Sequence, residues 1–404
     1  MSMDKKYTIK YGAVQVFYWA AFCSLLGFVA VFLLDKGYTN SEIGIIIALS
    51  NVLAVFLQPL IASLADKYEN VTIKTIIWIW TAVIFITALG LTLLKEASFL
   101  VSACITLAIV GVMVLQPFIN TISVQLEERG IFVNFGVCRA CGSFSYAVIS
   151  TVIGVLLRYY TVSLIPFSTV ILAVGIFGSV SILLRQKKEL KEGEQWEKKG
   201  HDSVDKKRKE ETKEAQDLVT FLRLHMKFFI FLVGVTFIFY YHVLSCNYLF
   251  QIIESVGGDS ASMGVASAIS AVVELPAMIL FIKIVQKVGC RKLLRISGFF
   301  FVVKSILFFM ATSVEMIYVA QLFQSGGYAL FIPASVYYVG KLLNRADMVK
   351  GQSLVTTAIT LGGVFASVVG GRMLDNYGAS TTLLVGAIVA VIGVISMSLS
   401  VEEV

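Results

Sequence analysis

The chain has 404 residues, of which 57% are hydrophobic and 15% are charged, and its formal net charge is +7. A soluble domain with this balance would expose far more apolar surface than water tolerates, so a soluble enzyme or binding module is excluded. The basic residues follow polar loops between apolar segments and do not form one basic patch. This distribution argues against a nucleic-acid partner.

Long apolar segments follow one another along the chain, and a helix needs about 20 such residues to cross the hydrocarbon core. Strand-like alternation over roughly ten residues does not recur, which argues against an outer-membrane barrel. We therefore predict an all-α membrane protein with about twelve transmembrane helices in two six-helix bundles. The expected spans are 11–34, 42–64, 75–94, 98–124, 136–158, 163–185, 226–251, 261–284, 293–312, 315–340, 352–374 and 381–400.

One long polar stretch, from about Arg185 to Asp217, separates the two halves of the chain. Its mixed charge and scarcity of aromatic residues are typical of a solvated linker. We predict an N-terminal bundle over residues 1–185, a charged cytoplasmic linker over 186–220 and a C-terminal bundle over 221–404. Basic residues concentrate in the linker and in alternate loops, so the positive-inside rule places both termini in the cytoplasm.

Ionisable residues deep in the spans are few, and in the N-terminal spans two groups of polar residues each share a helical face. Arg139, Ser143 and Tyr146 follow one another at i, i+4 and i+7 in the fifth span. Gln116 and Asn120 are four residues apart in the fourth span. We interpret these five residues as candidates for binding a small polar solute, against the alternative that they only join helices or, for Arg139, reach the interface.

The C-terminal spans carry the other candidates. A charged group at the centre of a span costs about 2.5–3.5 kcal/mol on insertion scales, so each needs a reason. Glu274 in the eighth span is the only carboxylate far from a helix end, and Lys304 lies in the ninth. We assign Glu274, Lys304 and His242 to proton coupling, with ion pairing or a neutral buried histidine as the alternatives. Glu274 is also a solute-binding candidate, together with Asn247 and one stripe of the tenth span that carries Gln321, Gln324 and Tyr328.

Two loops at equivalent places in the two halves carry charge. One holds Asp66 and Lys67 after the second span, and the other holds Arg291 after the eighth. Charges there can pair with helix ends and hold one conformation, so we predict a gating role, with ordinary positive-inside topology as the alternative.

Six cysteines are scattered along the chain, most of them within the expected spans, and only Cys138 and Cys141 form a C-x-x-C pair. Because no second pair exists, free thiols packed between helices are favoured over a metal or redox site. No nucleotide-binding loop, nucleophile elbow or metal cluster is present in the sequence. We expect no enzymatic activity, no cofactor and no bound metal.

Two motifs carry a resemblance to a known family. The stretch from Ser41 to Lys67, which includes Phe56-Leu57-Gln58-Pro59-Leu60, resembles the second span and following loop of the lactose permeases. The stretch from Asn134 to Ser143 resembles the motif that opens the fifth span in the same family, in phenylpropionate permeases and, more loosely, in nucleoside–proton symporters. The resemblance implies a major facilitator transporter of the oligosaccharide–proton symporter group in the bacterial cytoplasmic membrane.

The resemblance also implies roles for individual residues. Arg139 falls on the family's substrate-binding arginine, Tyr146 on the position of an aromatic ring that stacks on sugar, and Glu274 on a carboxylate that binds sugar and couples to protons. Lys304 takes the place of an arginine and Gln324 that of a histidine. The sequence departs from the family where Asn120 replaces a carboxylate and Gly327 replaces the proton-carrying glutamate.

We therefore expect proton-coupled symport of a sugar or glycoside by alternating access, with protons, a small polar solute and the lipid bilayer as partners and the monomer as the working form. The first alternative keeps the fold and carries a nucleoside or a small aromatic or organic acid, since Arg139 and Lys304 outnumber Glu274. The second is an uncoupled facilitator, because the family's glutamate is lost. A sensor is disfavoured because no signalling domain is recognisable.

Overall fold

The structure is a computed structural model that describes residues 3–68, 72–184, 221 and 223–403, with the side chains of Asp66, Arg345 and Ala346 left undescribed. The chain divides into two compact units, Met1–Asp202 and Ser203–Val404. The linker predicted over residues 186–220 lies outside the described residues. Over the described ranges the protein is helical throughout and contains no strand, which confirms the all-α prediction.

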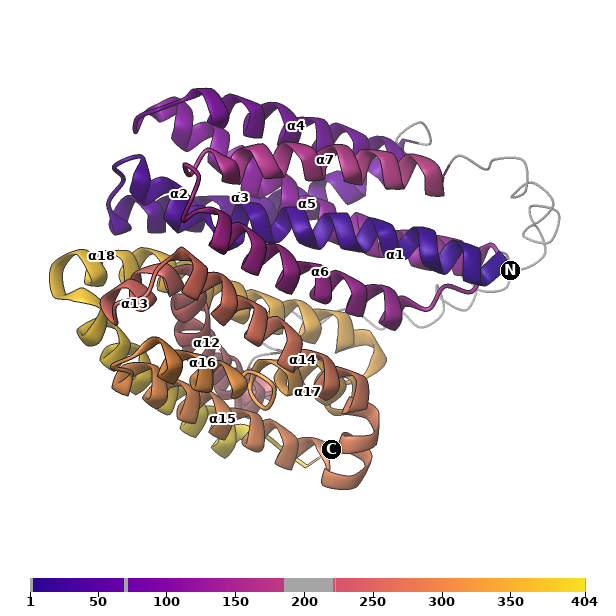
Figure 1. The fold of residues 1–404 in the computed structure, drawn as a ribbon. Helices are drawn as coiled ribbons and strands as arrows, with labels where there is room; N and C mark the ends of the chain where they lie inside the picture. Colours follow the sequence, from indigo (N-terminus) through magenta and orange to yellow (C-terminus); the bar gives the residue numbers. More distant parts are fainter. Residues whose placement is uncertain (1–2, 69–71, 185–220, 222, 404) are drawn as a thin grey trace. The chain divides into compact units, whose positions relative to one another are not determined.

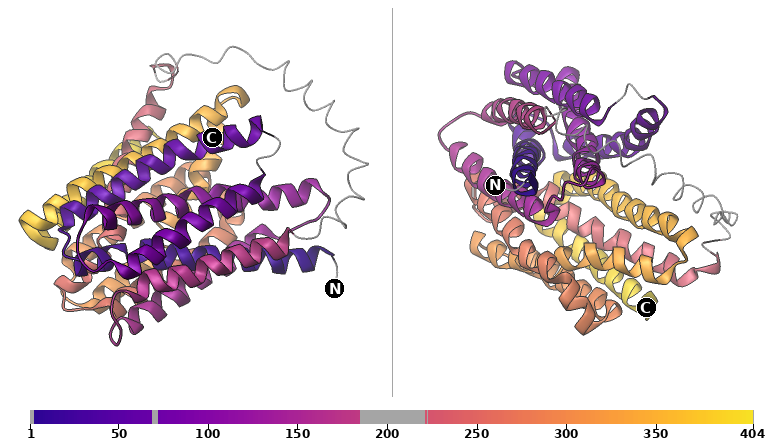
Figure 2. Two further views of the ribbon diagram at one scale, coloured as in Figure 1. Left: turned by 90° about the horizontal axis from the view of Figure 1, so that it is seen from above. Right: turned by 90° about the vertical axis from the view of Figure 1, so that its right-hand side faces the viewer.

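The helices of the first unit run along a common direction, and α1 lies between α6 and α7 (Figures 1 and 2). Ser, Thr and Asn side chains cap the helix starts by accepting backbone N–H groups, as at Thr39, Thr72, Ser98 and Asn134. The elements are α1 (Met3–Phe22), a π-helix η1 (Cys23–Gly27), α2 (Val29–Asp35), α3 (Asn40–Lys67), α4 (Ile73–Leu93), α5 (Phe99–Glu128), α6 (Phe135–Leu156) and α7 (Leu164–Leu183).

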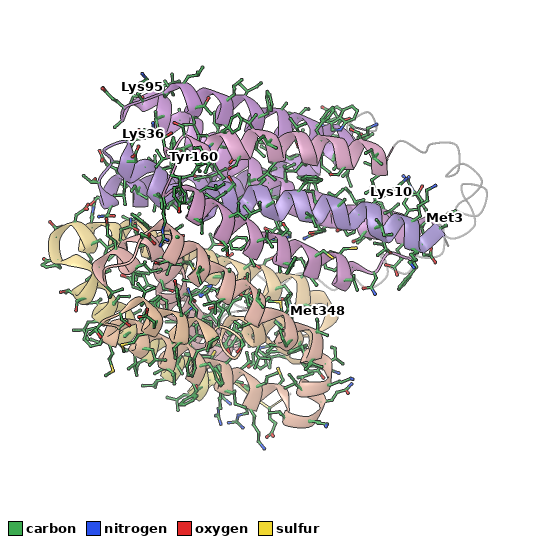
Figure 3. The ribbon with its side chains drawn as sticks, viewed as in Figure 1. Met3, Lys10, Lys36, Lys95, Tyr160 and Met348 are labelled. Carbon is green, nitrogen blue, oxygen red and sulfur yellow. The ribbon has the colours of Figure 1, made fainter. Side chains whose placement is uncertain are left out.

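Five residues labelled in Figure 3 mark the two ends of this unit. Met3 and Lys10 lie at one end, while Lys36, Lys95 and Tyr160 lie at the other (Figure 3). A backbone hydrogen bond also places the Lys36 and Lys95 loops at the same end, since the amide of Ala97 donates to the carbonyl of Lys36 at 3.0 Å. The chain thus crosses the unit once with each long helix, as expected of successive membrane spans.

The second unit is built from seven helices in its described part. They are α12 (Met226–Asn247), α13 (Leu249–Ser255), α14 (Ser260–Val288), α15 (Cys290–Met310), α16 (Val314–Leu322), α17 (Tyr328–Leu342) and α18 (Arg345–Ser400). Its core is rich in aromatic residues, and Phe231, Phe331 and Tyr338 are fully buried in it. The helices α12 and α18 pack closely. Gly234 and Gly393 allow their backbones to approach, because a Cβ on Gly234 would lie 2.7 Å from the carbonyl oxygen of Gly393.

Ten helical stretches within the described ranges are long and apolar enough to cross a membrane. They are consistent with the twelve predicted spans. The helix α18 joins the two last predicted spans across a kink at Gly378, whose φ of 75° is in the left-handed region that favours glycine.

The predicted tenth span, 315–340, is not one helix. It is broken between α16 and α17, and residues 323–327 form the break. The prediction that Gln321, Gln324 and Tyr328 share one continuous helical stripe is therefore wrong. Gly326 lies in the break, and a Cβ there would lie 2.1 Å from Cδ1 of Phe300, so only glycine allows this close packing.

Candidate functional site

In the first unit the central group is the guanidinium of Arg139. Its Cζ atom lies 3.8 Å from the ring centroid of Trp19 on α1. Its Nη1 donates to Oγ of Ser143 at 2.7 Å, so the predicted shared face of these two residues on α6 is confirmed. Both side chains are half-buried. A cation this close to an indole face is attracted by the ring quadrupole.

The fully buried amide of Gln15 connects Trp19 to the fourth predicted span. Its Oε1 accepts from Nε1 of Trp19 at 3.0 Å. Its Nε2 donates to the hydroxyl of Tyr11 at 2.8 Å and to Oδ1 of Asn120 at 3.3 Å. The predicted candidates Arg139 and Asn120 are therefore brought into one cluster by two residues of α1 that the sequence analysis missed. Gln116 lies one turn before Asn120 on α5 and is half-buried.

Tyr146 has a different environment. Its hydroxyl lies 3.4 Å from the position that a Cβ on Gly27 would occupy, and it also contacts Cys23. It therefore faces the π-helix η1. Ser24 anchors the same π-helix to α7 through Ser168 at 2.6 Å and Thr169 at 3.0 Å.

In the second unit an amide connects two opposite charges. Nζ of Lys304 donates to Oε1 of Gln324 at 2.7 Å, and Nε2 of Gln324 donates to Oε1 of Glu274 at 2.9 Å. Lys304 and Gln324 are 2% and 3% exposed, so the ammonium lies in a low-dielectric interior where its hydrogen bonds are strong. We call these three residues the charge relay.

His242 belongs to an aromatic group beside the relay. Its ring stacks on Tyr328 with centroids 4.7 Å apart and planes 17° apart. Phe239 and Phe301 meet it edge-on. Its Nε2 lies 4.0 Å from Sγ of Cys246, and its Nδ1 has no hydrogen-bond partner among the described residues. Tyr328 is thus the tyrosine on which the His242 ring stacks.

Two further candidates lie elsewhere in this unit. Asn247 donates to Oγ of Ser367 at 2.9 Å and so ties α12 to α18. Gln321 is 4% exposed, and its Oε1 has no partner in the described part of the chain.

The gating candidates are at exposed ends of helices. The side chain of Asp66 lies outside the described residues. Nζ of Lys67 lies 5.4 Å from the ring centroid of Tyr68. Nη1 of Arg291 lies 3.8 Å from a carboxylate oxygen of Glu403, which is 87% exposed.

The cysteines are free thiols. Sγ of Cys138 donates to the carbonyl of Thr8 at 3.2 Å, while Cys141 is exposed. Over the residues that the structure describes, no group of three or more His, Cys, Asp or Glu side chains is placed to hold a metal ion.

These features, an all-helical chain of membrane-length spans with polar clusters inside them, define a polytopic membrane transporter. The sequence matches the MFS_1-like family over residues 8–385, and the chain belongs to that family of major facilitator transporters. This membership sets it apart from enzymes.

Relatives and solved structures agree with this class. The chain is 24% identical over 400 residues to the uncharacterized transporter YwbF of Bacillus subtilis (strain 168), covering 95% of this chain and 91% of that protein. Its fold is similar to a crystal structure of a point mutant of the nucleoside transporter NupG, with a TM-score of 0.79, 15% identity and coverage of 98% and 100% of the two chains. It is also similar to a bacterial homologue of the iron transporter ferroportin, with a TM-score of 0.69, 13% identity and full coverage of both chains.

Proposed function

We propose that this protein is a proton-coupled symporter of a small hydroxylated solute, with a sugar or glycoside as the first candidate. Arg139, Ser143 and Asn120 of the first unit hydrogen-bond the solute, and Tyr146 offers an aromatic face. In the second unit Glu274, Gln324, Gln321, Tyr328 and Asn247 are the proposed solute contacts. Guanidinium, amide and carboxylate groups are suited to hydroxyls because they supply both donors and acceptors.

The observation that carries the proposal is the charge relay. While Glu274 is ionised, its charge balances that of Lys304, and Gln324 holds both groups in place. A protonated carboxyl oxygen is a weaker acceptor than a carboxylate. Protonation of Glu274 therefore weakens the relay and leaves the buried ammonium without its counter-charge, so proton binding changes the stability of this arrangement.

In this proposal the proton binds in the second unit, which also supplies part of the solute contacts. Solute hydroxyls replace the hydrogen bonds that the relay loses on protonation, so the loaded and protonated protein is the form that changes conformation. His242, stacked beside the relay on Tyr328, is a second proton-accepting candidate. We place the protein in the cytoplasmic membrane with both termini in the cytoplasm, from the distribution of basic loops.

A nucleoside is the second candidate, and the likeness in fold to NupG, a nucleoside transporter, favours it. A nucleoside combines ribose hydroxyls with a flat base. The phenol rings of Tyr146 and Tyr328 are suited to stack on such a base. The same residues would then bind the nucleoside, and the aromatic contacts would contribute more to its affinity than they do for a sugar.

The test is uptake into proteoliposomes under an imposed inward proton gradient, with separate panels of sugars, nucleosides and small aromatic acids. We expect accumulation above equilibrium of one class. Glu274→Gln is expected to abolish accumulation but to keep exchange of labelled for unlabelled solute, because the amide still hydrogen-bonds. Glu254→Gln, an exposed carboxylate at the end of α13, is the matched control. Unchanged accumulation in Glu274→Gln would overturn proton coupling at this residue, and transport of acids alone would overturn the solute class.

A further inference from the structure

The orientation of Arg139 is set by α1, although Arg139 itself belongs to α6. Its Cζ lies over the ring of Trp19 at 3.8 Å from the centroid, well inside the limit of about 6 Å for such contacts. A guanidinium stacked on an aromatic face keeps its N–H groups in its own plane, where they remain able to hydrogen-bond. The indole thus fixes the plane of the group, and Ser143 fixes one of its edges.

Trp19 is in turn fixed by three different contacts. Its Nε1 donates to Gln15 at 3.0 Å. Tyr18 and Phe22 lie against it with ring centroids 5.3 and 5.1 Å away. Gln15 is completely buried and uses its other end to hold Asn120. A rotation of the indole would therefore break a partly buried hydrogen bond as well as aromatic packing, which favours one orientation.

Gly142 completes this arrangement from α6. A Cβ at this position would lie 2.4 Å from Cδ1 and 3.1 Å from Cγ of Trp19, and 3.3 Å from the carbonyl oxygen of Gln15. The atoms that this Cβ would meet belong to a rigid indole ring and to the backbone, and not to the end of a flexible side chain. Because Gly142 follows Arg139 by three residues, the same turn of α6 carries the cation and leaves room for the ring.

We propose that Trp19 is the positioning residue for Arg139, and that Gln15 and Gly142 hold it in place. In this role the indole presents the guanidinium to the solute in a preset plane, so less conformational freedom is lost on binding. The inference rests on the proposed function, because it assumes that Arg139 contacts the solute. It adds a set of residues on α1 that control affinity without themselves contacting the solute.

The test compares solute KM and maximal rate in exchange assays with Trp19→Leu, Trp19→Phe and Gly142→Ala. We expect Trp19→Leu to raise KM by roughly 5- to 30-fold, the range that corresponds to a partly desolvated cation–π contact. The maximal rate is expected to change by less than about twofold, since positioning for binding is what is lost. Trp19→Phe keeps an aromatic face and is expected to show a smaller rise, while Gly142→Ala displaces the ring and resembles Trp19→Leu.

Trp78→Leu is the matched control, because Lys74 lies over the ring of Trp78 at 4.3 Å elsewhere in the same unit. A general loss of stability would affect both tryptophan variants alike and would overturn the inference, as would an unchanged KM in Trp19→Leu. If Trp19→Leu fails to fold, the test rests on Trp19→Phe and Gly142→Ala. An unchanged KM in both variants would then overturn the positioning role of Trp19.

The Arg139→Gln background separates this inference from the proposed function. If Trp19 acts through Arg139, adding Trp19→Leu to Arg139→Gln raises KM by less than about twofold further. A full additional rise would show that Trp19 acts independently and would overturn the positioning role while leaving solute binding by Arg139 intact. An unchanged KM in Arg139→Gln alone would instead contradict the proposed function.

Discussion

Lys304 and Glu274 lie on neighbouring helices and are connected through one side-chain amide, that of Gln324. The ammonium donates to one end of the amide, and the other end donates to the carboxylate, at 2.7 and 2.9 Å. Gln324 itself lies in the break between α16 and α17, so any movement at that break acts directly on both charges.

Loss of this amide is expected to destabilise the protein. Gln324→Leu leaves a 2% exposed ammonium without its acceptor, and an unsatisfied buried charged group costs about 1–3 kcal/mol or more. The melting temperature in detergent is therefore expected to fall by several degrees. Gln321→Leu is the control of equal size, since Oε1 of Gln321 has no hydrogen-bond partner among the described residues. An equal loss in both variants would contradict the relay.

The break in the tenth span is expected to depend on Gly326. In Gly326→Ala the new methyl group meets Phe300 at 2.1 Å, and overpacking of this kind typically costs about 1–3 kcal/mol. Gly340→Ala on α17 is the control, because its methyl group would meet only Sδ of Met348 at 3.7 Å. We expect thermal unfolding at lower temperature for Gly326→Ala and no decrease for Gly340→Ala; the reverse order would show that the break is not set by this packing.

Membrane orientation is expected to follow the basic loops. Single cysteines at Met3 and Lys10 are placed at one end of the first unit, and cysteines at Lys95 and Tyr160 at the other (Figure 3). In a variant without native cysteines, a membrane-impermeant thiol reagent added to intact cells is expected to label Lys95→Cys and Tyr160→Cys. Met3→Cys and Lys10→Cys should react only after the cells are opened. Labelling of Met3→Cys in intact cells would place the N-terminus outside.

The hydrogen bond between Asn247 and Ser367 is expected to contribute to stability and little to coupling. It joins α12 to α18 at 2.9 Å, and such interhelical bonds are worth on average about 0.6 kcal/mol in a membrane protein. Ser367→Ala is therefore expected to lower the melting temperature slightly and to leave the accumulation ratio unchanged. A large loss of accumulation would mean that this pair belongs to the coupling machinery.

Much of the fold was predictable because the membrane imposes a simple pattern. The apolar blocks predicted most helix ends to within a few residues. The length of an apolar block and the polar residue that caps it are both local features of the sequence. The break at residues 323–327 was missed, although Gly326 and Gly327 lie in it, because the packing of Phe300 from another helix on Gly326 is not visible in the sequence.

The candidate site was predictable only in part. The common face of Arg139 and Ser143 follows from their spacing on α6. Trp19 and Gln15 were missed because an indole in an apolar span is ordinary there, although Tyr11, Gln15 and Trp19 recur at i, i+4 and i+8. The bridge through Gln324 depends on how α14 and α15 meet the break between α16 and α17, which spacing within one helix does not reveal.

The measurement that tests the central claim most directly is solute-driven proton uptake by proteoliposomes, followed as alkalinisation of a weakly buffered outside medium. The account predicts that adding the transported solute raises the external pH with the wild-type protein and leaves it unchanged with Glu274→Gln, while Glu254→Gln behaves like the wild type. Solute entry without any proton movement in the wild type, or equal alkalinisation with Glu274→Gln, would contradict it.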